Sequence, residues 1–184
     1  MQKTALLVMD MQSAVLAMMA ADASILKQNI TKAIAHARKQ EIPVLYVVVG
    51  FRSGGPEINP ANKSFAAFKE RIGSKSPAEW MRIDDSVAPL PGDIIITKRR
   101  VSAFAGSDLE IVLRSQGIQH LVLSGVATSG VVLSTLREAA DKDYRLTVLS
   151  DCCADRDDEA HRVLLEKVFP RQADVLTTDK WIAK

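Results

Sequence analysis

The chain has 184 residues, of which 47% are hydrophobic and 25% are charged. This length and composition suit a single domain with its own core, and we expect residues 1–184 to form it. The net charge of +2 is concentrated on no arm or tail, which argues against nucleic acid as a partner. No apolar run is long enough to span a bilayer, so no membrane partner is expected. The two cysteines are adjacent, which excludes a disulfide framework and predicts a cytoplasmic protein.

Short apolar runs alternate with helical patterns along the chain. In chain order, the predicted elements are a strand at 4–9, a helix at 23–40, a strand at 44–49, a loop at 50–60, a helix at 62–72, an irregular stretch at 74–91, a strand at 93–97, a helix at 107–115, a strand at 120–124, a turn at 125–130, a helix at 131–142, a strand at 146–150, a helix at 157–168 and a strand at 173–176. This alternation predicts an α/β fold: a doubly wound, Rossmann-like sheet of about six parallel strands between two helical layers.

Three polar features lie at predicted carboxyl ends of strands. Asp10 ends the first strand, Lys98 ends the third, and the turn at residues 125–130 follows the fourth. Because these ends meet along one edge of a doubly wound sheet, a carboxylate and an ammonium group there could exchange protons with a substrate. The alternatives are a helix cap for Asp10 and a solvated strand end for Lys98. The turn matches neither a phosphate-binding loop nor a dinucleotide fingerprint, and no cofactor is predicted.

The motifs at these positions together resemble a known family. Val8-Met9-Asp10-Met11-Gln12 is similar to its opening strand motif, and Lys98 with the following Ser102-Ala103-Phe104 is similar to its lysine motif. The segment from Gly125 to Val132 is similar to the one that normally ends in Cys-Val. The sequence thus resembles the isochorismatase-like hydrolase, or cysteine hydrolase, superfamily from about residue 3 to residue 178.

The resemblance implies a set of catalytic positions. Asp10 and Lys98 would be the acid–base pair, and the Val126–Ala127 bond would be a cis peptide that shapes an oxyanion hole. The backbone N–H groups of Ala127 and Val131 would point toward that hole. By this resemblance Val131 would occupy the position of the family's cysteine nucleophile, and since valine has no nucleophilic atom, thioester chemistry would be excluded there.

The resemblance leaves three hypotheses for function. Isochorismatases that lack the cysteine protonate a vinyl ether, so the first is a cysteine-independent hydrolase of a small, anionic metabolite using Asp10 and Lys98. The second is a catalytically inactive member that binds a small molecule or forms oligomers. The third is a cysteine hydrolase whose nucleophile has been replaced, naturally or by design. The family also implies a homodimer or a higher homo-oligomer.

The remaining predictions concern substrate and metal. Arg52, Arg99 and Phe104 are predicted to contact the substrate, the arginines by pairing with its anionic group. No metal site is predicted, because residues 50–63 contain no His or Asp and the three histidines have no ligand spacing. Cys152 and Cys153 follow the fifth predicted strand, where one of them could reach the pocket or both could fill the core.

Overall fold

The computed structural model describes residues 3–19, 23–73 and 75–184. Six strands form one sheet in the order β3-β2-β1-β4-β5-β6, and all neighbouring strands run parallel. The strands are β1 (Thr4–Met9), β2 (Val44–Val49), β3 (Ile94–Lys98), β4 (His120–Val126), β5 (Arg145–Ala154) and β6 (Asp174–Leu176). The predicted α/β fold with a six-stranded parallel sheet is confirmed.

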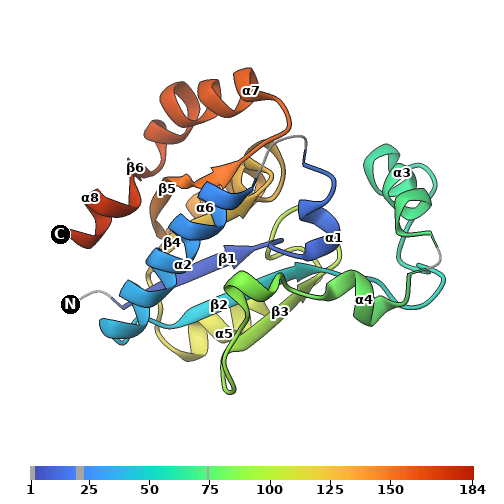
Figure 1. Cartoon of the computed structure of the whole chain (residues 1–184), viewed down its shortest axis with the longest axis horizontal. Helices are drawn as coiled ribbons and strands as arrows, with labels where there is room; N and C mark the ends of the chain where they lie inside the picture. The colour runs from blue at the N-terminus through green and yellow to red at the C-terminus, as the bar shows by residue number, and fades with distance from the viewer. Residues whose placement is uncertain (1–2, 20–22, 74) are drawn as a thin grey trace.

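Helices connect the strands and cover both faces of the sheet (Figure 1). The α-helices are α1 (Ser13–Leu16), α2 (Ser24–Lys39), α3 (Lys63–Ile72), α4 (Pro77–Met81), α5 (Leu109–Ser115), α6 (Leu133–Asp141), α7 (Asp158–Val163) and α8 (Thr178–Ile182). Two short 3₁₀ helices are η1 (Asp85–Val87) and η4 (Phe169–Arg171). Two π-helical turns, which are wider than α-helical ones and are called wide turns below, are η2 (Thr128–Val132) and η3 (Leu164–Val168). Within the described ranges, no helix has the length and apolarity needed to cross a membrane.

The alternation of side chains along β1 divides the core into two layers. Leu6 and Val8 face one layer, which α2 and α8 close with side chains such as Ile30 and Trp181. Ala5, Leu7 and Met9 face the other, which α5 and α6 close. Both faces of β1 are therefore buried, which explains why its sequence is a continuous apolar run rather than an alternating one.

The strand order creates a crevice at the carboxyl end of the sheet. From β1 the chain moves outward through β2 to β3, and it then returns to place β4 on the other side of β1. Crevices at such reversals of strand order are the usual ligand sites of open α/β sheets. In Figure 1 this end of the sheet faces α1 and α3.

The fifth strand is longer than predicted. The prediction ended it at residue 150, whereas β5 continues to Ala154 and contains Cys152 and Cys153. The register between β4 and β5 shifts after Leu123, and pairing resumes with Gly125 opposite Cys153. The extra residues of this irregularity lie in β5, between Val148 and Cys153, and the extension depends on renewed pairing with β4 beyond them, which the local sequence does not reveal.

Short helices account for most other differences. The stretch at 74–91 was predicted to be irregular, but it contains α4, which starts with a reciprocal capping box between Ser76 and Glu79. Neither α1 nor α8 was predicted, since four or five residues are too few to show the periodic apolar pattern of an amphipathic helix. The helix predicted from residue 131 begins at Leu133, after the wide turn η2.

Candidate active site

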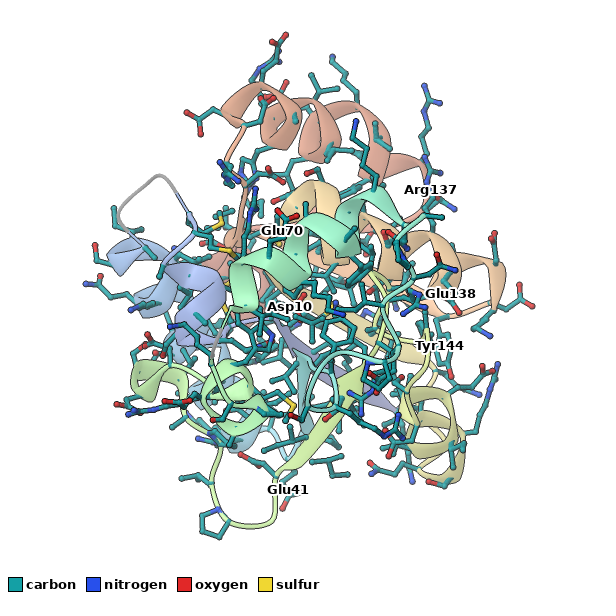
Figure 2. The ribbon with its side chains drawn as sticks, turned by 90° about the vertical axis from the view of Figure 1, so that its right-hand side faces the viewer. Asp10, Glu41, Glu70, Arg137, Glu138 and Tyr144 are labelled. Carbon is teal, nitrogen blue, oxygen red and sulfur yellow. The ribbon has the colours of Figure 1, made fainter. Side chains whose placement is uncertain are left out.

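Asp10 lies directly after β1 with its backbone in the left-handed region, at a φ of 54°. Its N–H donates to the carbonyl of Val47 at 2.8 Å, which fixes the residue beside β2. Left-handed backbone is uncommon for residues other than glycine, although Asp and Asn tolerate it best. Such conformations gather at functional sites. Figure 2 shows Asp10 near the centre of the molecule when viewed from the right-hand side of Figure 1.

Lys98 forms a buried ion pair with Asp10. Lys98 Nζ lies 3.0 Å from Asp10 Oδ2, and the two residues are 2% and 6% exposed. Residue 98 ends β3, where it pairs with Val49 of β2. The ammonium group also donates to the carbonyl of Arg100 at 3.0 Å. The structure thus brings together the two charged side chains that the sequence placed at separate strand ends.

The two carboxylate oxygens of Asp10 have different surroundings. Oδ2 meets Lys98, whereas Oδ1 is buried without a hydrogen-bond partner in the described structure. Burial raises the pKa of Asp10, and the nearby Lys98 ammonium, with a smaller effect of the Val49 backbone N–H, opposes that rise without cancelling it. A buried carboxyl with a raised pKa and one uncommitted oxygen is suited to donate a proton.

A cavity of about 200 Å³ opens beside the ion pair. Its walls are mostly apolar and come from α1, the end of β2, α3 and the β4–η2 segment. The lining residues are Asp10, Val15, Val49, Ser64, Phe65, Phe68, Lys98, Val101, Val126, Ala127, Gly130 and Val131. Val131 therefore shares one cavity with Asp10 and Lys98, and the charged groups face a surface that carries few other polar atoms.

The turn after β4 approaches the end of β1 very closely. Gly125 has a φ of +128°, and a Cβ atom there would lie 2.0 Å from the carbonyl oxygen of Met9. Only glycine fits at this contact. The following peptide bond, between Val126 and Ala127, is cis. Since Met9 precedes Asp10, this close contact fixes the distance between the turn and the carboxylate.

Two side chains from the β5–α7 region hold η2 in place. Asp155 accepts a hydrogen bond from the backbone N–H of Ser129 at 2.6 Å. His161 Nδ1 lies within hydrogen-bond distance, 2.8 Å, of the Thr128 hydroxyl. Sequence analysis assigned no role to either contact, because the partners are more than 25 residues apart and belong to no local motif.

Gln12 is a further polar residue of the site, and its side chain is fully buried. Its Nε2 donates to the carbonyls of Val49 at 3.1 Å and Trp80 at 2.7 Å, and its Oε1 accepts from the N–H of Val49 at 2.7 Å. Trp80 Nε1 donates to the same Val49 carbonyl at 3.0 Å. Gln12 therefore joins the segment after β1 to the end of β2 and to α4. Its place in the opening motif, two residues after Asp10, was the signal in the sequence.

The three predicted substrate contacts do not line the cavity. Arg52 is largely exposed and pairs with Glu57 at 2.7 Å. Arg99 lies 3.7 Å from the same carboxylate and donates to the carbonyl of Gly50 at 2.7 Å. Phe104 is buried in the core, where its ring packs 6.1 Å from that of Tyr144. The arginines are thus engaged by a nearby glutamate that the motif-based prediction did not consider.

Both cysteines are buried in β5 and neither lines the cavity. Cys152 contacts the hydroxyl of Thr178 at 3.0 Å, and burial raises the pKa of this thiol to about 12. Burial also raises the pKa of Cys153. Both thiols are therefore protonated and poorly nucleophilic at neutral pH. Of the two interpretations left open by the sequence, core filling agrees with these positions.

The described residues contain no group of three or more His, Cys, Asp or Glu side chains placed to hold a metal ion. The polar groups that line the cavity are those of Asp10, Lys98, Ser64 and the backbone of the turn.

Comparison with known proteins adds to this geometry. The isochorismatase domain family matches residues 4–180. The chain belongs to the isochorismatase family. It is 31% identical to the uncharacterized isochorismatase family protein YwoC of Bacillus subtilis, over 98% of this chain and 93% of that one. It is 36% identical to ureidoacrylate amidohydrolase RutB of Pantoea ananatis, over 82% of this chain and 68% of that one.

The fold agrees with this assignment to the isochorismatase family. An isochorismatase family protein from Burkholderia thailandensis has a TM-score of 0.85 and 27% identity, and the match covers 98% of this chain and 94% of that one. The resemblance read from the motifs around Asp10, Lys98 and Gly125 is thereby confirmed at the level of the family.

Proposed function

We propose that this isochorismatase family member is a hydrolase that acts by proton transfer from Asp10, with no covalent cysteine intermediate. The observation that carries the proposal is the buried Asp10–Lys98 pair, 3.0 Å apart, in a cavity whose wall includes Val131. In this proposal Val131 stands at the family's nucleophile position. Valine cannot form a thioester, so the carboxyl and the ammonium group are left as the reactive groups.

The environment of Asp10 supports the role of an acid. A general acid must hold its proton before the reaction and tolerate losing it afterwards. Burial raises the pKa of Asp10 and so favours the protonated form, and Oδ1 accepts no hydrogen bond of ordinary geometry, since the nearby Val49 N–H donates to Gln12 Oε1 at 2.7 Å. After the proton has left, the Lys98 ammonium at 3.0 Å stabilises the carboxylate. Burial thus favours the protonated carboxyl of Asp10 before the proton transfer, and Lys98 stabilises the carboxylate after it.

Hydrolysis of a vinyl ether is the reaction that fits these groups. The Asp10 carboxyl donates its proton to the terminal alkene carbon, which leaves an oxocarbenium ion and the Asp10 carboxylate. Water adds to the cationic carbon and returns a proton to Asp10. The resulting hemiketal breaks its C–O bond to give a ketone and an alcohol. No step requires a nucleophilic side chain.

The cavity limits the substrate. About 200 Å³ holds only a small reacting group, and valine and phenylalanine side chains form most of its walls. We therefore propose a small metabolite whose reacting part is uncharged. The contacts of Arg52 and Arg99 with Glu57 lend no support to an anionic group bound by these two arginines.

A second candidate function is small-molecule binding without catalysis. The contact that favours it is the ion pair itself, since Lys98 satisfies one oxygen of Asp10 and the carbonyl of Arg100. A mutually satisfied buried pair can be retained for structure alone. The unpartnered Oδ1 of Asp10 favours catalysis over this alternative.

A hydrolysis screen separates the two candidates. Vinyl ethers and amides are incubated with the wild type, Asp10→Asn and Lys98→Ala, and Asp84→Asn serves as a control that disrupts a different ion pair, with Lys27 at 2.9 Å. We expect vinyl ether turnover in the wild type and the control, reduced about 10²-fold or more in Asp10→Asn.

Several outcomes of the screen contradict the proposal. Equal turnover in Asp10→Asn and the wild type removes the catalytic role of this carboxyl. Amide turnover by the wild type that alkylation of a β5 cysteine abolishes overturns the cysteine-free mechanism. Binding of a vinyl ether with no turnover by any variant supports the inactive alternative.

A further inference from the structure

A second, larger cavity lies on the other side of α1 from the Asp10–Lys98 cavity. It encloses about 750 Å³, and its polar wall contains four cationic side chains. Arg71 comes from the end of α3, Lys75 from the segment after it, Arg82 from the end of α4 and Arg156 from the segment after β5. We call this cavity the cationic cleft. Segments distant in the sequence thus line one open cleft with four solvent-exposed cationic side chains.

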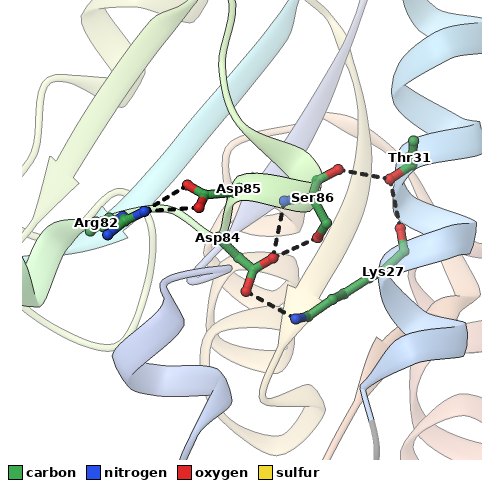
Figure 3. Close-up of polar contacts among 6 residues, drawn as sticks. All are labelled: Lys27, Thr31, Arg82, Asp84, Asp85 and Ser86. Carbon is green, nitrogen blue, oxygen red and sulfur yellow. Dashed lines mark hydrogen bonds and ion pairs between the residues drawn. The ribbon is translucent and has the colours of Figure 1, made fainter.

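The positive charge of the cationic cleft is only partly neutralised by the protein. Arg82 pairs with Asp85 through two contacts, at 3.0 and 2.8 Å (Figure 3). For Arg71, Lys75 and Arg156, no side-chain hydrogen bond or ion pair occurs within the part of the chain that the structure describes. Like charges that share a concave surface raise the local concentration of anions.

The acidic residue in the lining does not balance these charges. Glu79 accepts hydrogen bonds from the N–H and the hydroxyl of Ser76, at 2.8 and 2.7 Å. Those hydrogen bonds lower the pKa of Glu79, and the positive charge of nearby Lys75 lowers it further, so the carboxylate is engaged in the helix cap and also offsets part of the Lys75 charge. Among the described residues, Arg71 and Arg156 therefore line the cleft without an ion-pair partner, and Lys75 is only partly offset by Glu79.

The cleft is separate from the cavity that holds Asp10. Its floor contains Ala14, Ala17 and Met18, whereas Val15 of the same short segment lines the other cavity. The rings of Phe68 and Trp80 pack edge to face, 4.7 Å apart, at the boundary. A ligand of the cationic cleft therefore meets an apolar floor and a cationic rim, and it does not contact the acid–base pair.

We propose that the cationic cleft binds a small organic polyanion that carries at least two phosphate or carboxylate groups. The guanidinium groups of Arg71 and Arg156 pair with these groups through parallel N–H donors, and Lys75 adds a point charge. The volume lies within the range of small-molecule sites, roughly 300–1,000 Å³. This inference does not depend on the reaction at Asp10.

Calorimetry at about 0.15 M ionic strength, where the Debye length is about 8 Å, tests the inference, with pyrophosphate as the phosphate probe and citrate as the carboxylate probe. The test variant is Arg71→Gln with Arg156→Gln. Its matched control, Arg137→Gln with Arg145→Gln, removes the same number of charges away from the cleft, and Arg137 is labelled on α6 in Figure 2. Melting temperatures of both variants verify that each is folded.

We expect at least one probe to bind the wild type, and the test variant to raise its Kd at least tenfold. The control variant changes that Kd by less than about twofold, because charges farther from the cleft than the Debye length are largely screened. Preference for pyrophosphate or citrate identifies the anionic group that the cleft accepts. Equal weakening in both double variants shows a general charge effect and overturns the proposal. Failure of both probes to bind the wild type at millimolar concentration also overturns it.

Discussion

Replacement of Gln12 by leucine tests whether this buried side chain holds the site together. Gln12 makes three hydrogen bonds with the backbone of Val49 and Trp80, at 2.7–3.1 Å. The Val49 carbonyl retains the indole N–H of Trp80, but the Val49 N–H and the Trp80 carbonyl lose their partner. Each buried group left without a partner costs about 1–3 kcal/mol.

We expect Gln12→Leu to lower the free energy of unfolding by about 3 kcal/mol, since the leucine recovers part of the loss through apolar contacts. For a chain of this length, that loss corresponds to a Tm lower by about 6–12 °C. Circular dichroism during urea and thermal unfolding measures both quantities. Gln28→Leu, on the exposed side of α2, is the matched control, with an expected change within about 0.5 kcal/mol. Equal stability of Gln12→Leu and this control would refute the reasoning.

Three further changes probe the turn, the thiols and the nucleophile position. Gly125→Ala should lower the free energy of unfolding, measured by chemical denaturation, by about 3 kcal/mol or more, because its Cβ would lie 2.0 Å from the carbonyl oxygen of Met9 in β1. The control Gly54→Ala has open space around the added Cβ and should lower it by only about 1 kcal/mol, owing to the positive φ at that residue. Both β5 thiols should resist iodoacetamide in the native protein at pH 8, since burial raises the pKa of Cys152 to about 12, and rapid labelling by mass spectrometry would contradict this. Val131→Cys should confer amide hydrolysis that iodoacetamide abolishes, because residue 131 lines the cavity. The control Val132→Cys, in the core, should show no amide hydrolysis. Absence of amide hydrolysis in both variants would contradict the assignment of residue 131 as the nucleophile position.

The sequence predicted the sheet well because its strands carry a strong local signal. The runs at Thr4–Met9 and Val44–Val49 are buried on both faces, so they read as continuous apolar segments with polar ends. The end of β5 was missed because it depends on pairing with β4 after a register shift. The short helix α4 was missed because one capping box, between Ser76 and Glu79, is a small signal.

The candidate site was predictable only where topology alone decides the position. Asp10 and Lys98 end parallel strands, and such ends must gather at one edge of the sheet, so their meeting could be anticipated. The contacts of Arg52 and Arg99 could not be anticipated, because their partner Glu57 lies in an irregular loop whose course the sequence does not specify. Phe104 belongs to a segment that resembles a family motif, but such a resemblance does not show whether a ring faces a cavity or the core.

The protonation state of Asp10 is the central claim, and carbon-13 NMR titration of its carboxyl group tests it most directly. Asp10→Asn identifies the signal. We predict a midpoint above the ordinary value of 3.8, and a higher one in Lys98→Met, because Lys98 lowers the pKa that burial raises. Only the protonated form donates a proton, so hydrolysis should decline as the pH rises through that midpoint. The native state also binds this proton more tightly than the unfolded chain, so the stability due to Asp10 decreases over the same interval above pH 3.8. A midpoint at or below 3.8 would show that the folded protein does not favour the protonated carboxyl, and it would contradict an acid role.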